Sequence, residues 1–272
     1  MELIDTHAHI DLPRFGDAAA RLAAAGRAQA AGIVGIVVPG VEPATWDAML
    51  ATAALLRAAV PGVGIHTAIG IHPQVLPDLE PGSDGDHCDA LATRVLAAPP
   101  GMVAIGECGL DFGPAVEKAG APRERQVAVL QAHLALARRT GLPLVLHCLY
   151  AHAALLELVR AAPLPPSILH SWSGSAELAV QFCRAGHLVS FAGSITLPRA
   201  RRPLESARAV PSDRLLIETD SPDQTPSPRR PARNEPAFLP DVAAAVAAAR
   251  GEPVAEVAAR TTANARRLLG LA

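Results

Sequence analysis

Aromatic residues and lysine are scarce in this chain. Aromatic side chains make up 3% of the 272 residues, and Lys118 is the only lysine. So few aromatic rings limit base stacking along an extended nucleic-acid strand. The formal net charge of −2 provides no general attraction to a polyanion. Any binding of nucleic acid must therefore come from a local patch of arginines.

Paired cysteines and long apolar runs are also absent. The cysteines form no C-x-x-C pair; they are Cys88, Cys108, Cys148 and Cys183. Unpaired thiols in a chain of this size indicate a reducing compartment. No apolar run has the length of a membrane span, and the first strand follows Met1 so closely that we expect no signal peptide. We therefore expect a cytoplasmic protein outside the membrane, and no feature indicates an obligate protein partner.

Short apolar runs alternate with alanine-rich segments of helical length. There are eight such runs: Leu3–His9, Ile33–Pro39, His66–His72, Met102–Glu107, Pro143–His147, Ser167–His170, His187–Phe191 and Leu215–Thr219. Alternating strands and helices indicate βαβ units, and eight of them predict an α/β fold, a (β/α)8 TIM barrel, as one domain over residues 1–272. A doubly wound open sheet is the alternative, but no G-x-G-x-x-G follows the first strand.

The segments between these runs have helical length and end signals. The expected helices are Asp17–Ala31, Pro43–Ala59, Arg123–Thr140, Ala153–Ala162 and Ala176–Ala185, with closing helices at Pro240–Arg250 and Val254–Leu269. Gly32, Gly141 and Gly186 follow three of them, as is common at helix C-termini. Three segments after strands are read as long loops on the carboxyl face of the barrel: Pro73–His87, Gly109–Pro122 and Ser221–Pro236.

Metal-ligand residue types collect at the strand ends. His7 and His9 are two residues apart, so a regular strand projects both toward the same side, which in a barrel we take as the interior. Four further strand ends carry ligand-type residues: Glu107, His147, His170 and Asp220. Four histidines and two carboxylates at one barrel mouth form a mixed nitrogen and oxygen set suited to Zn²⁺, Mn²⁺, Co²⁺ or Mg²⁺.

Six stretches in order along the chain resemble the TatD family of metal-dependent deoxyribonucleases, a branch of the amidohydrolase-like barrels. They are Asp5–His9, Gly70–Pro73, Gly106–Asp111, Pro143–Cys148, His170–Gly174 and Glu218–Pro222. The resemblance implies two divalent metal ions, one held by His7 and His9 and the other by His147 and His170, with Glu107 between them. It also implies that Asp220 lies beside the attacking water, where it can act as general base. The chain departs from the family pattern at Gln74 and Leu149, where relatives often carry histidine and arginine.

Other residues are candidates for substrate contact. His72 ends the third strand at the mouth, and Trp172 follows His170 with a ring that can stack on a base. Arg229, Arg230 and Arg233 make the loop after the last strand locally positive. A second arginine group, Arg199, Arg201 and Arg202, follows the seventh strand. We expect His66, His87, His133, His152 and His187 to have no functional role.

The predicted function is hydrolysis of phosphodiester bonds in DNA or another nucleic acid by a metal-activated water. An alternative keeps the site and changes the bond, giving a small-molecule or D-aminoacyl-tRNA-like ester hydrolase. A third hypothesis, a non-catalytic metal-stabilised binding protein, predicts no free carboxylate, whereas Asp220 supplies one. Because Glu107 occupies the fourth strand end and Lys118 lies well beyond it, a lysine-bridged metal pair is disfavoured.

Overall fold

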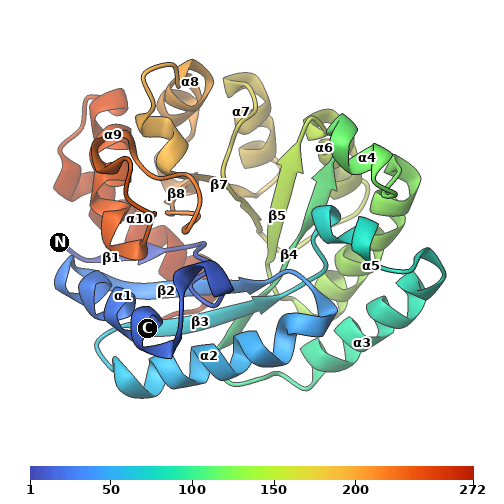
Figure 1. The fold of residues 1–272 in the computed structure, drawn as a ribbon. Helices are drawn as coiled ribbons and strands as arrows, with labels where there is room; N and C mark the ends of the chain where they lie inside the picture. Colours follow the sequence, from blue (N-terminus) through green and yellow to red (C-terminus); the bar gives the residue numbers. More distant parts are fainter.

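The structure, a computed structural model, describes all 272 residues, and its centre is one sheet of eight parallel strands in sequence order. The strands are β1 Leu3–Asp5, β2 Ile33–Gly40, β3 Gly64–Ile69, β4 Met102–Asp111, β5 Leu144–Leu149, β6 Ile168–Leu169, β7 Leu188–Phe191 and β8 Leu215–Ile217. Beyond the ends of β1 and β8, a parallel bridge pairs Ala8 with Ser221, and Asp220 N–H donates to His7 O at 2.9 Å. These bonds join the first strand to the last, so the predicted TIM barrel is confirmed (Figure 1).

Ten α-helices surround this sheet (Figure 1). They are α1 Ala18–Ala30, α2 Trp46–Ala59, α3 Asp84–Leu96, α4 Pro114–Lys118, α5 Arg123–Thr140, α6 His152–Arg160, α7 Ala176–Arg184, α8 Arg201–Ala209, α9 Leu239–Arg250 and α10 Val254–Leu269. All seven predicted helices are present, and α5 and α10 match the predicted bounds. Gly32, Gly141 and Gly186 all have positive φ, as a left-handed helix end requires. Considering length and hydropathy together, none of the helices qualifies as a membrane span.

Three helices, α3, α4 and α8, were not predicted from the sequence. The expected loop Pro73–His87 contains two 3-10 turns and the start of α3, and Gly109–Pro122 contains the end of β4 and the short α4. The third, α8, begins after Ala200 with no side chain capping its first turn. Without a capping residue, the start of α8 has no local sequence signal.

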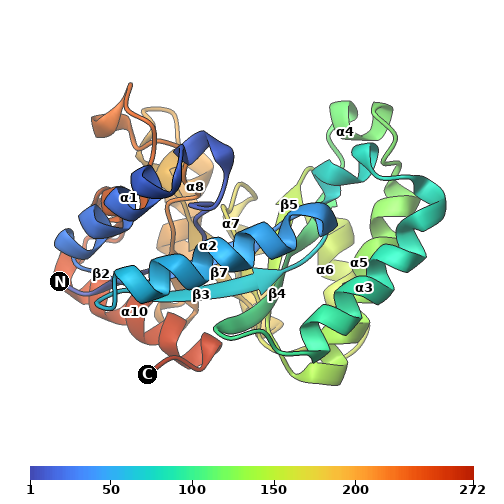
Figure 2. The same ribbon diagram turned by 60° about the horizontal axis from the view of Figure 1, so that its bottom comes forward.

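One apolar layer of the barrel interior contains one residue from each strand. This layer consists of Ile4, Val37, Ala68, Ala104, Val145, Ile168, Leu188 and Leu216, and Ala265 and Leu269 of α10 pack against it. Asn264 of α10 donates to Leu215 O at 2.9 Å, at the start of β8. The last helix therefore covers the amino-terminal end of the barrel, and Figure 2 shows α10 on the opposite side of the sheet from α4.

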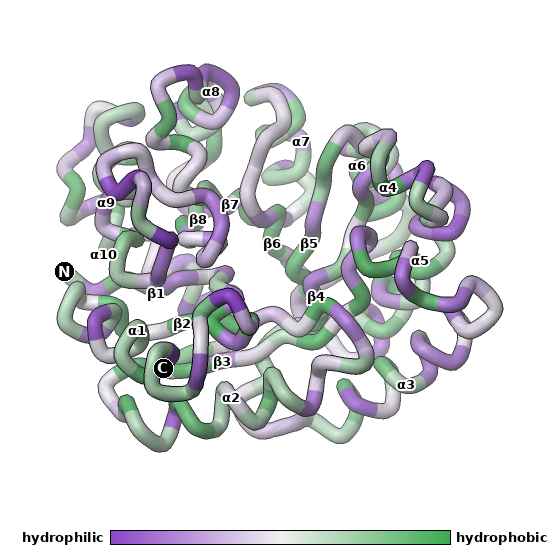
Figure 3. Tube along the Cα trace, viewed as in Figure 1, coloured by the Kyte–Doolittle hydropathy of each residue, from purple (hydrophilic) through white to green (hydrophobic).

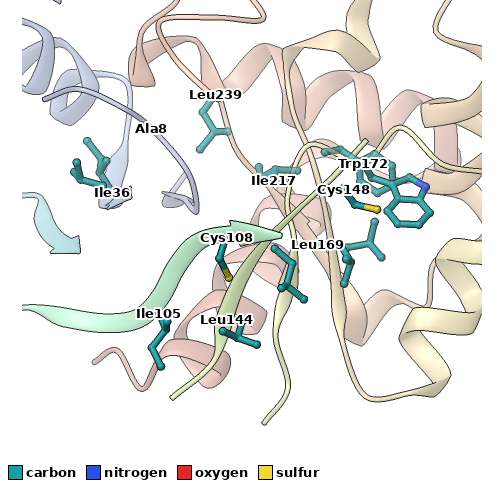
Figure 4. Packing of buried hydrophobic residues seen from close by; sticks show 14 of the residues in the cluster. Ala8, Ile36, Ile105, Cys108, Leu144, Cys148, Leu169, Trp172, Ile217 and Leu239 are labelled. Atoms are coloured by element: carbon teal, nitrogen blue, oxygen red, sulfur yellow. The ribbon is translucent and has the colours of Figure 1, made fainter. Parts of the chain in front are cut away.

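A larger apolar cluster lies between the strands and the surrounding helices. Its strand residues include Ile105, Cys108, Leu144 and Leu169, which Figure 4 shows packed side by side. Hydrophobic segments follow the strands in Figure 3, whereas the start of α8 is strongly hydrophilic. With the amino-terminal end closed by apolar contacts, the polar strand ends gather at the opposite, carboxyl end of the barrel.

Candidate active site

Seven ligand-type side chains meet at the carboxyl end of the barrel. We call them the metal cluster: His7, His9, His72, Glu107, His147, His170 and Asp220. All six predicted ligands are members, and His72, predicted as a substrate contact, is the seventh. A cavity of about 450 Å³ opens over the cluster and is lined by six of the seven.

Glu107 lies at the centre of the cluster and uses its two oxygens for different partners. Its Oε2 is 3.2 Å from His7 Nε2 and 3.5 Å from His9 Nε2. Its Oε1 is 2.7 Å from His170 Nε2, 2.9 Å from His72 Nε2 and 3.2 Å from His147 Nδ1. One carboxylate thus has imidazole nitrogens on both sides.

His7 and His9 reach the cluster because β1 ends before them. Ile4 belongs to the interior layer, and Thr6 Oγ1 contacts Ser190 Oγ at 3.1 Å, also inside the barrel. Strict alternation from Ile4 and Thr6 would send His7 and His9 outward. β1 ends at Asp5 and the chain bends at Thr6, which shifts the alternation by one residue. The two histidines share one side, as predicted, but that side is the interior only because of the bend.

An irregularity in β4 turns Glu107 inward. Ala104 is part of the interior layer, so regular alternation would place Glu107 outside. The pairing of β4 with β5 shifts register between Ile105 and Cys108, as at a β-bulge. Gly106, within this shift, has φ +135°, and a Cβ there would lie 2.6 Å from Val145 O. Glycine is therefore required beside the central carboxylate.

Asp220 reaches the cluster from beyond the end of β8. Its Oδ1 is 3.7 Å from His7 Nε2 and 3.9 Å from His9 Nε2, and its side chain is 14% exposed. Its backbone has φ +56°, which is unusual for a residue with a side chain. Gln224 donates a hydrogen bond from Nε2 to Asp220 Oδ2. Both cluster carboxylates line the cavity, but the side chain of Asp220 is the more exposed, at 14% against 3% for Glu107.

Two fully buried carboxylates support the cluster from below. Asp5 accepts hydrogen bonds from Thr219 N at 2.9 Å and Thr219 Oγ1 at 2.6 Å, tying β1 to the end of β8. Burial, with a smaller contribution from Glu218, raises the pKa of Asp5 to about 7. Glu218 Oε1 accepts from Ser171 N and lies 3.4 Å from His170 Nδ1. Neither Asp5 nor Glu218 was predicted as a site residue, although both lie in stretches that resemble the TatD family.

His147 has a comparable neighbour in Asp111. Its Nε2 is 3.8 Å from Asp111 Oδ2, which accepts a hydrogen bond from Gln74 Nε2 at 2.8 Å. Gln74, one of the two departures from the family pattern, thus helps to hold the carboxylate beside His147. Asp111 was not among the predicted site residues.

The electrostatics favour an ionised Glu107. Burial alone would raise its pKa, but the surrounding imidazoles, His72 and His170 foremost, hold the pKa well below its ordinary value. Burial opposes the charged form of His170 as well, yet Glu107 and Glu218 raise the pKa of His170 well above its ordinary value. Burial lowers the pKa of His72 to about 4.

The donor set fits divalent metal ions. Three groups of nitrogen and carboxylate oxygen atoms lie close enough to share an ion: His7, His9 and Glu107; His72, Glu107 and His147; and His7, His170 and Asp220. His7 Nε2 and His9 Nε2 face each other at 3.0 Å, as do His147 Nδ1 and His170 Nε2 at 3.2 Å. Neutral imidazole nitrogens and a shared carboxylate are ligands for Zn²⁺, Mn²⁺ or Co²⁺.

Trp172 and His72, both predicted to contact substrate, lie in other surroundings than that role suggested. Trp172 is 2% exposed, packs against Phe182 and donates from Nε1 to Ser206 Oγ at 3.1 Å, so its ring is mainly part of the core. His72 is within hydrogen-bonding distance of Glu107, among the ligand-type groups rather than on an outer wall.

Arg229, Arg230 and Arg233 do not line the cavities of the site. Each guanidinium has a local partner: Arg229 pairs with Asp241 at 2.6 Å, Arg230 donates to Thr225 O at 3.2 Å, and Arg233 donates to Arg14 O at 2.6 Å. These contacts hold the loop after β8 in place. The second arginine group, Arg199, Arg201 and Arg202, does line a cavity that adjoins the metal cluster.

Known proteins share this chain's sequence and fold. Residues 4–270 match the family described as TatD related DNase. The chain is 34% identical to a Mycobacterium tuberculosis protein named "Uncharacterized metal-dependent hydrolase TatD", covering 99% of this chain and 98% of that protein. It is 35% identical to the "3'-5' ssDNA/RNA exonuclease TatD" of Klebsiella pneumoniae, covering 90% of each.

Solved structures agree. The crystal structure of YjjV, a TatD homologue from Escherichia coli, superposes with a TM-score of 0.87 at 31% identity, covering 99% of this chain and 98% of that one. A double mutant of an organophosphorus hydrolase from Deinococcus radiodurans, with a TM-score of 0.69 and 19% identity, shares the fold. The family match covers residues 4–270, a range that includes every residue of the metal cluster, and the two relatives align with 90% or more of the chain. The chain belongs to the TatD family of metal-dependent hydrolases.

Proposed function

We propose that this enzyme hydrolyses phosphodiester bonds at an end of single-stranded nucleic acid, using two divalent metal ions. The observation that carries the proposal is the position of Glu107, whose two oxygens face different groups of imidazoles. A carboxylate so placed is suited to bridge two cations. Several relatives are named 3'-5' ssDNA/RNA exonucleases, which supports this substrate class.

In this proposal, His7 and His9 hold one ion, and His147 and His170 hold the other, with Glu107 between them. His72 is an additional candidate ligand on the Oε1 side of Glu107. Two such ions lower the pKa of a bound water and stabilise the charge that develops on a phosphoryl oxygen. Zinc, manganese, cobalt and magnesium are the candidates, since their ligand preferences overlap with this set.

Asp220 has the position of a proton acceptor. It borders the cavity and lies within 4 Å of His7 and His9 Nε2, so a water held beside these groups is within its reach. Gln224 binds one carboxylate oxygen and fixes its rotation. Glu218 and Asp111 act through His170 and His147, which they orient from behind.

The test is a substrate panel run on one protein preparation with its metal content measured. The panel contains single- and double-stranded DNA, RNA, a p-nitrophenyl phosphodiester and a D-aminoacyl ester, each with Mn²⁺, Mg²⁺, Co²⁺ or Zn²⁺. We expect one to two metal ions per chain and fastest cleavage of single-stranded oligonucleotides. Efficient hydrolysis of the ester alone would replace the nuclease proposal with the ester-hydrolase alternative. Inactivity on every substrate with every metal would contradict both.

A further inference from the structure

A chamber of about 700 Å³ opens from the metal cluster toward the start of α8. We call it the α8 chamber. Its lining includes His147, His170 and Asp220 from the cluster and Arg199, Arg201 and Arg202 from the opposite wall. A substrate bound at the metals can therefore extend directly toward three arginines.

These three arginines are free to bind an anion. None of their guanidinium groups has a carboxylate partner or a side-chain hydrogen bond. By contrast, Arg14, which lines the cavity over the metal cluster, forms a bidentate pair with Asp223 at 2.6 and 2.7 Å. No acidic residue lies in the first turn of α8 to neutralise them. All three are exposed, so the charge is available at little cost in desolvation.

A second hollow continues the α8 chamber along the rim of the barrel. This rim groove, of about 530 Å³, shares Leu149, Ser173 and Arg202 with the chamber and is bordered by Tyr150. Tyr150 is the only tyrosine of the chain and is 72% exposed. It follows β5 directly and has φ +56°, a conformation uncommon for an aromatic residue. An exposed aromatic ring beside an unpaired arginine is the combination on which single strands stack.

We propose that the α8 chamber and the rim groove bind the single strand adjoining the scissile bond. Arg199, Arg201 and Arg202 contact its phosphates, and Tyr150 stacks on one of its bases. An arginine binds any phosphate and an aromatic ring stacks on any base. We therefore expect the affinity to increase with the length of the strand and not to depend on its base sequence. This inference rests on the proposed nuclease function and adds where the rest of the strand lies.

The experiment compares two double variants that remove the same charge. Arg201→Ala/Arg202→Ala removes two arginines from the chamber wall. Arg138→Ala/Arg139→Ala removes two exposed arginines from the last turn of α5, which precedes β5 and so lies at the amino-terminal end of the barrel. Binding is measured by anisotropy with a fluorescein-labelled, phosphorothioate-linked dT12, and cleavage with dT2, dT4 and dT12. Thermal unfolding checks that each variant is folded.

We expect the chamber variant to weaken dT12 binding by roughly 10-fold or more and to reduce the salt slope by about 1.4, the value for two single-strand phosphate contacts. Its loss in kcat/KM grows from dT2 to dT12. The α5 variant should bind dT12 as the unchanged protein does. Tyr150→Ala should weaken dT12 by about 5- to 100-fold, whereas Tyr150→Phe should retain binding.

The failures of the two proposals are distinguishable. Equal losses in both double variants, or no loss in the chamber variant, overturn this inference while metal-dependent cleavage of dT12 preserves the nuclease function. If neither the unchanged protein nor any variant cleaves an oligonucleotide, the proposed nuclease function is wrong. Loss of dT12 binding in the chamber variant alone would then still support the strand-binding surface.

Discussion

At the scale of single residues, the site separates two carboxylates by their surroundings. Glu107 is 2% exposed and has imidazoles on both sides, so its position suits holding metal. Asp220 borders the open cavity, and its Oδ2 accepts a hydrogen bond from Gln224 Nε2. The first is placed to hold ions and the second to exchange a proton with water.

Replacing Asp220 by asparagine tests this division. Asparagine keeps the size and one coordinating oxygen but accepts no proton. We expect Asp220→Asn to retain most of its metal while kcat falls roughly 10²- to 10⁴-fold, with no rescue by added metal. His147→Ala is the comparison: it should lose metal and recover part of its activity at high metal concentration. The measurement is metal content and kcat on the same samples.

The outcome for Asp220→Asn decides its role. If it loses metal and is rescued as His147→Ala is, Asp220 is a ligand only. The proton must then leave by another group.

At the scale of elements, irregular strand ends bring the candidate metal ligands together. β1 stops at Asp5 so that His7 and His9 turn inward, and β4 shifts register at Gly106 so that Glu107 does. By contrast, β5 and β6 keep strict alternation from Val145 to His147 and from Ile168 to His170. Regular strands thus place His147 and His170, and the irregular ends of β1 and β4 bring His7, His9 and Glu107 to the same point.

Gly106→Ala should disrupt the β4 irregularity. The new Cβ would lie 2.6 Å from Val145 O in a backbone with φ +135°, which L side chains rarely adopt. We expect a loss of at least about 2 kcal/mol in the free energy of unfolding and reduced metal content, measured by urea denaturation and elemental analysis. Gly26→Ala is the control, because a Cβ at that α1 position meets nothing within 4 Å. It should be neutral or up to about 1 kcal/mol more stable, and equal stability of the two variants would refute the packing argument.

At the scale of the whole molecule, apolar contacts close one end of the barrel and leave polar groups at the other. α10 covers the amino-terminal end through Ala265 and Leu269. Outside the metal cluster, the core also contains histidines that are buried without an acidic partner. His133 is one: its Nε2 accepts from Ile71 N–H at 3.0 Å, and its Nδ1 donates to Val129 O at 2.8 Å. A ring protonated at Nε2 could no longer accept the hydrogen bond from Ile71 N–H, so protonation of His133 must oppose folding.

Acid should therefore destabilise the protein through His133 and His187. Burial lowers the pKa of each to about 4, whereas an unfolded histidine has a pKa of about 6.5. Below pH 6.5 the unfolded chain binds protons that the native state excludes, so the free energy of unfolding falls toward pH 4. The expected slope is about 1.4 kcal/mol per pH unit for each histidine, with no effect above pH 6.5.

The variant His133→Gln isolates one of these two contributions. Urea unfolding at pH 7, 6 and 5 should show a shallower fall with pH than in the unchanged protein. His87→Gln, on the partly exposed surface of α3, should leave the slope unaltered. A slope in His133→Gln that matches the unchanged protein would contradict the account.

The fold and the family could be predicted from the sequence alone, and the six side chains that it offered as metal ligands lie together in the structure. Eight apolar runs alternating with helical segments specify the barrel, because parallel strands buried on both faces read as short apolar runs. The plain alternation of a strand also accounts for His147 and His170, each two residues past an interior apolar residue. Where the backbone is regular, the apolar runs and the two-residue alternation of a strand are enough to predict which way a side chain points.

Features that depend on irregular backbone, or on contacts between distant segments, could be established from the three-dimensional fold alone. Alternation places His7, His9 and Glu107 on the wrong side, and only the bend at Thr6 and the shift at Gly106 correct it. The buried supports Asp5 and Glu218 are found through their hydrogen bonds across the barrel. The two arginine groups look alike in sequence, but Arg229 is paired with Asp241, whereas Arg201 and Arg202 face the chamber. A local pattern records which residues are present, whereas their partners are set by three-dimensional packing.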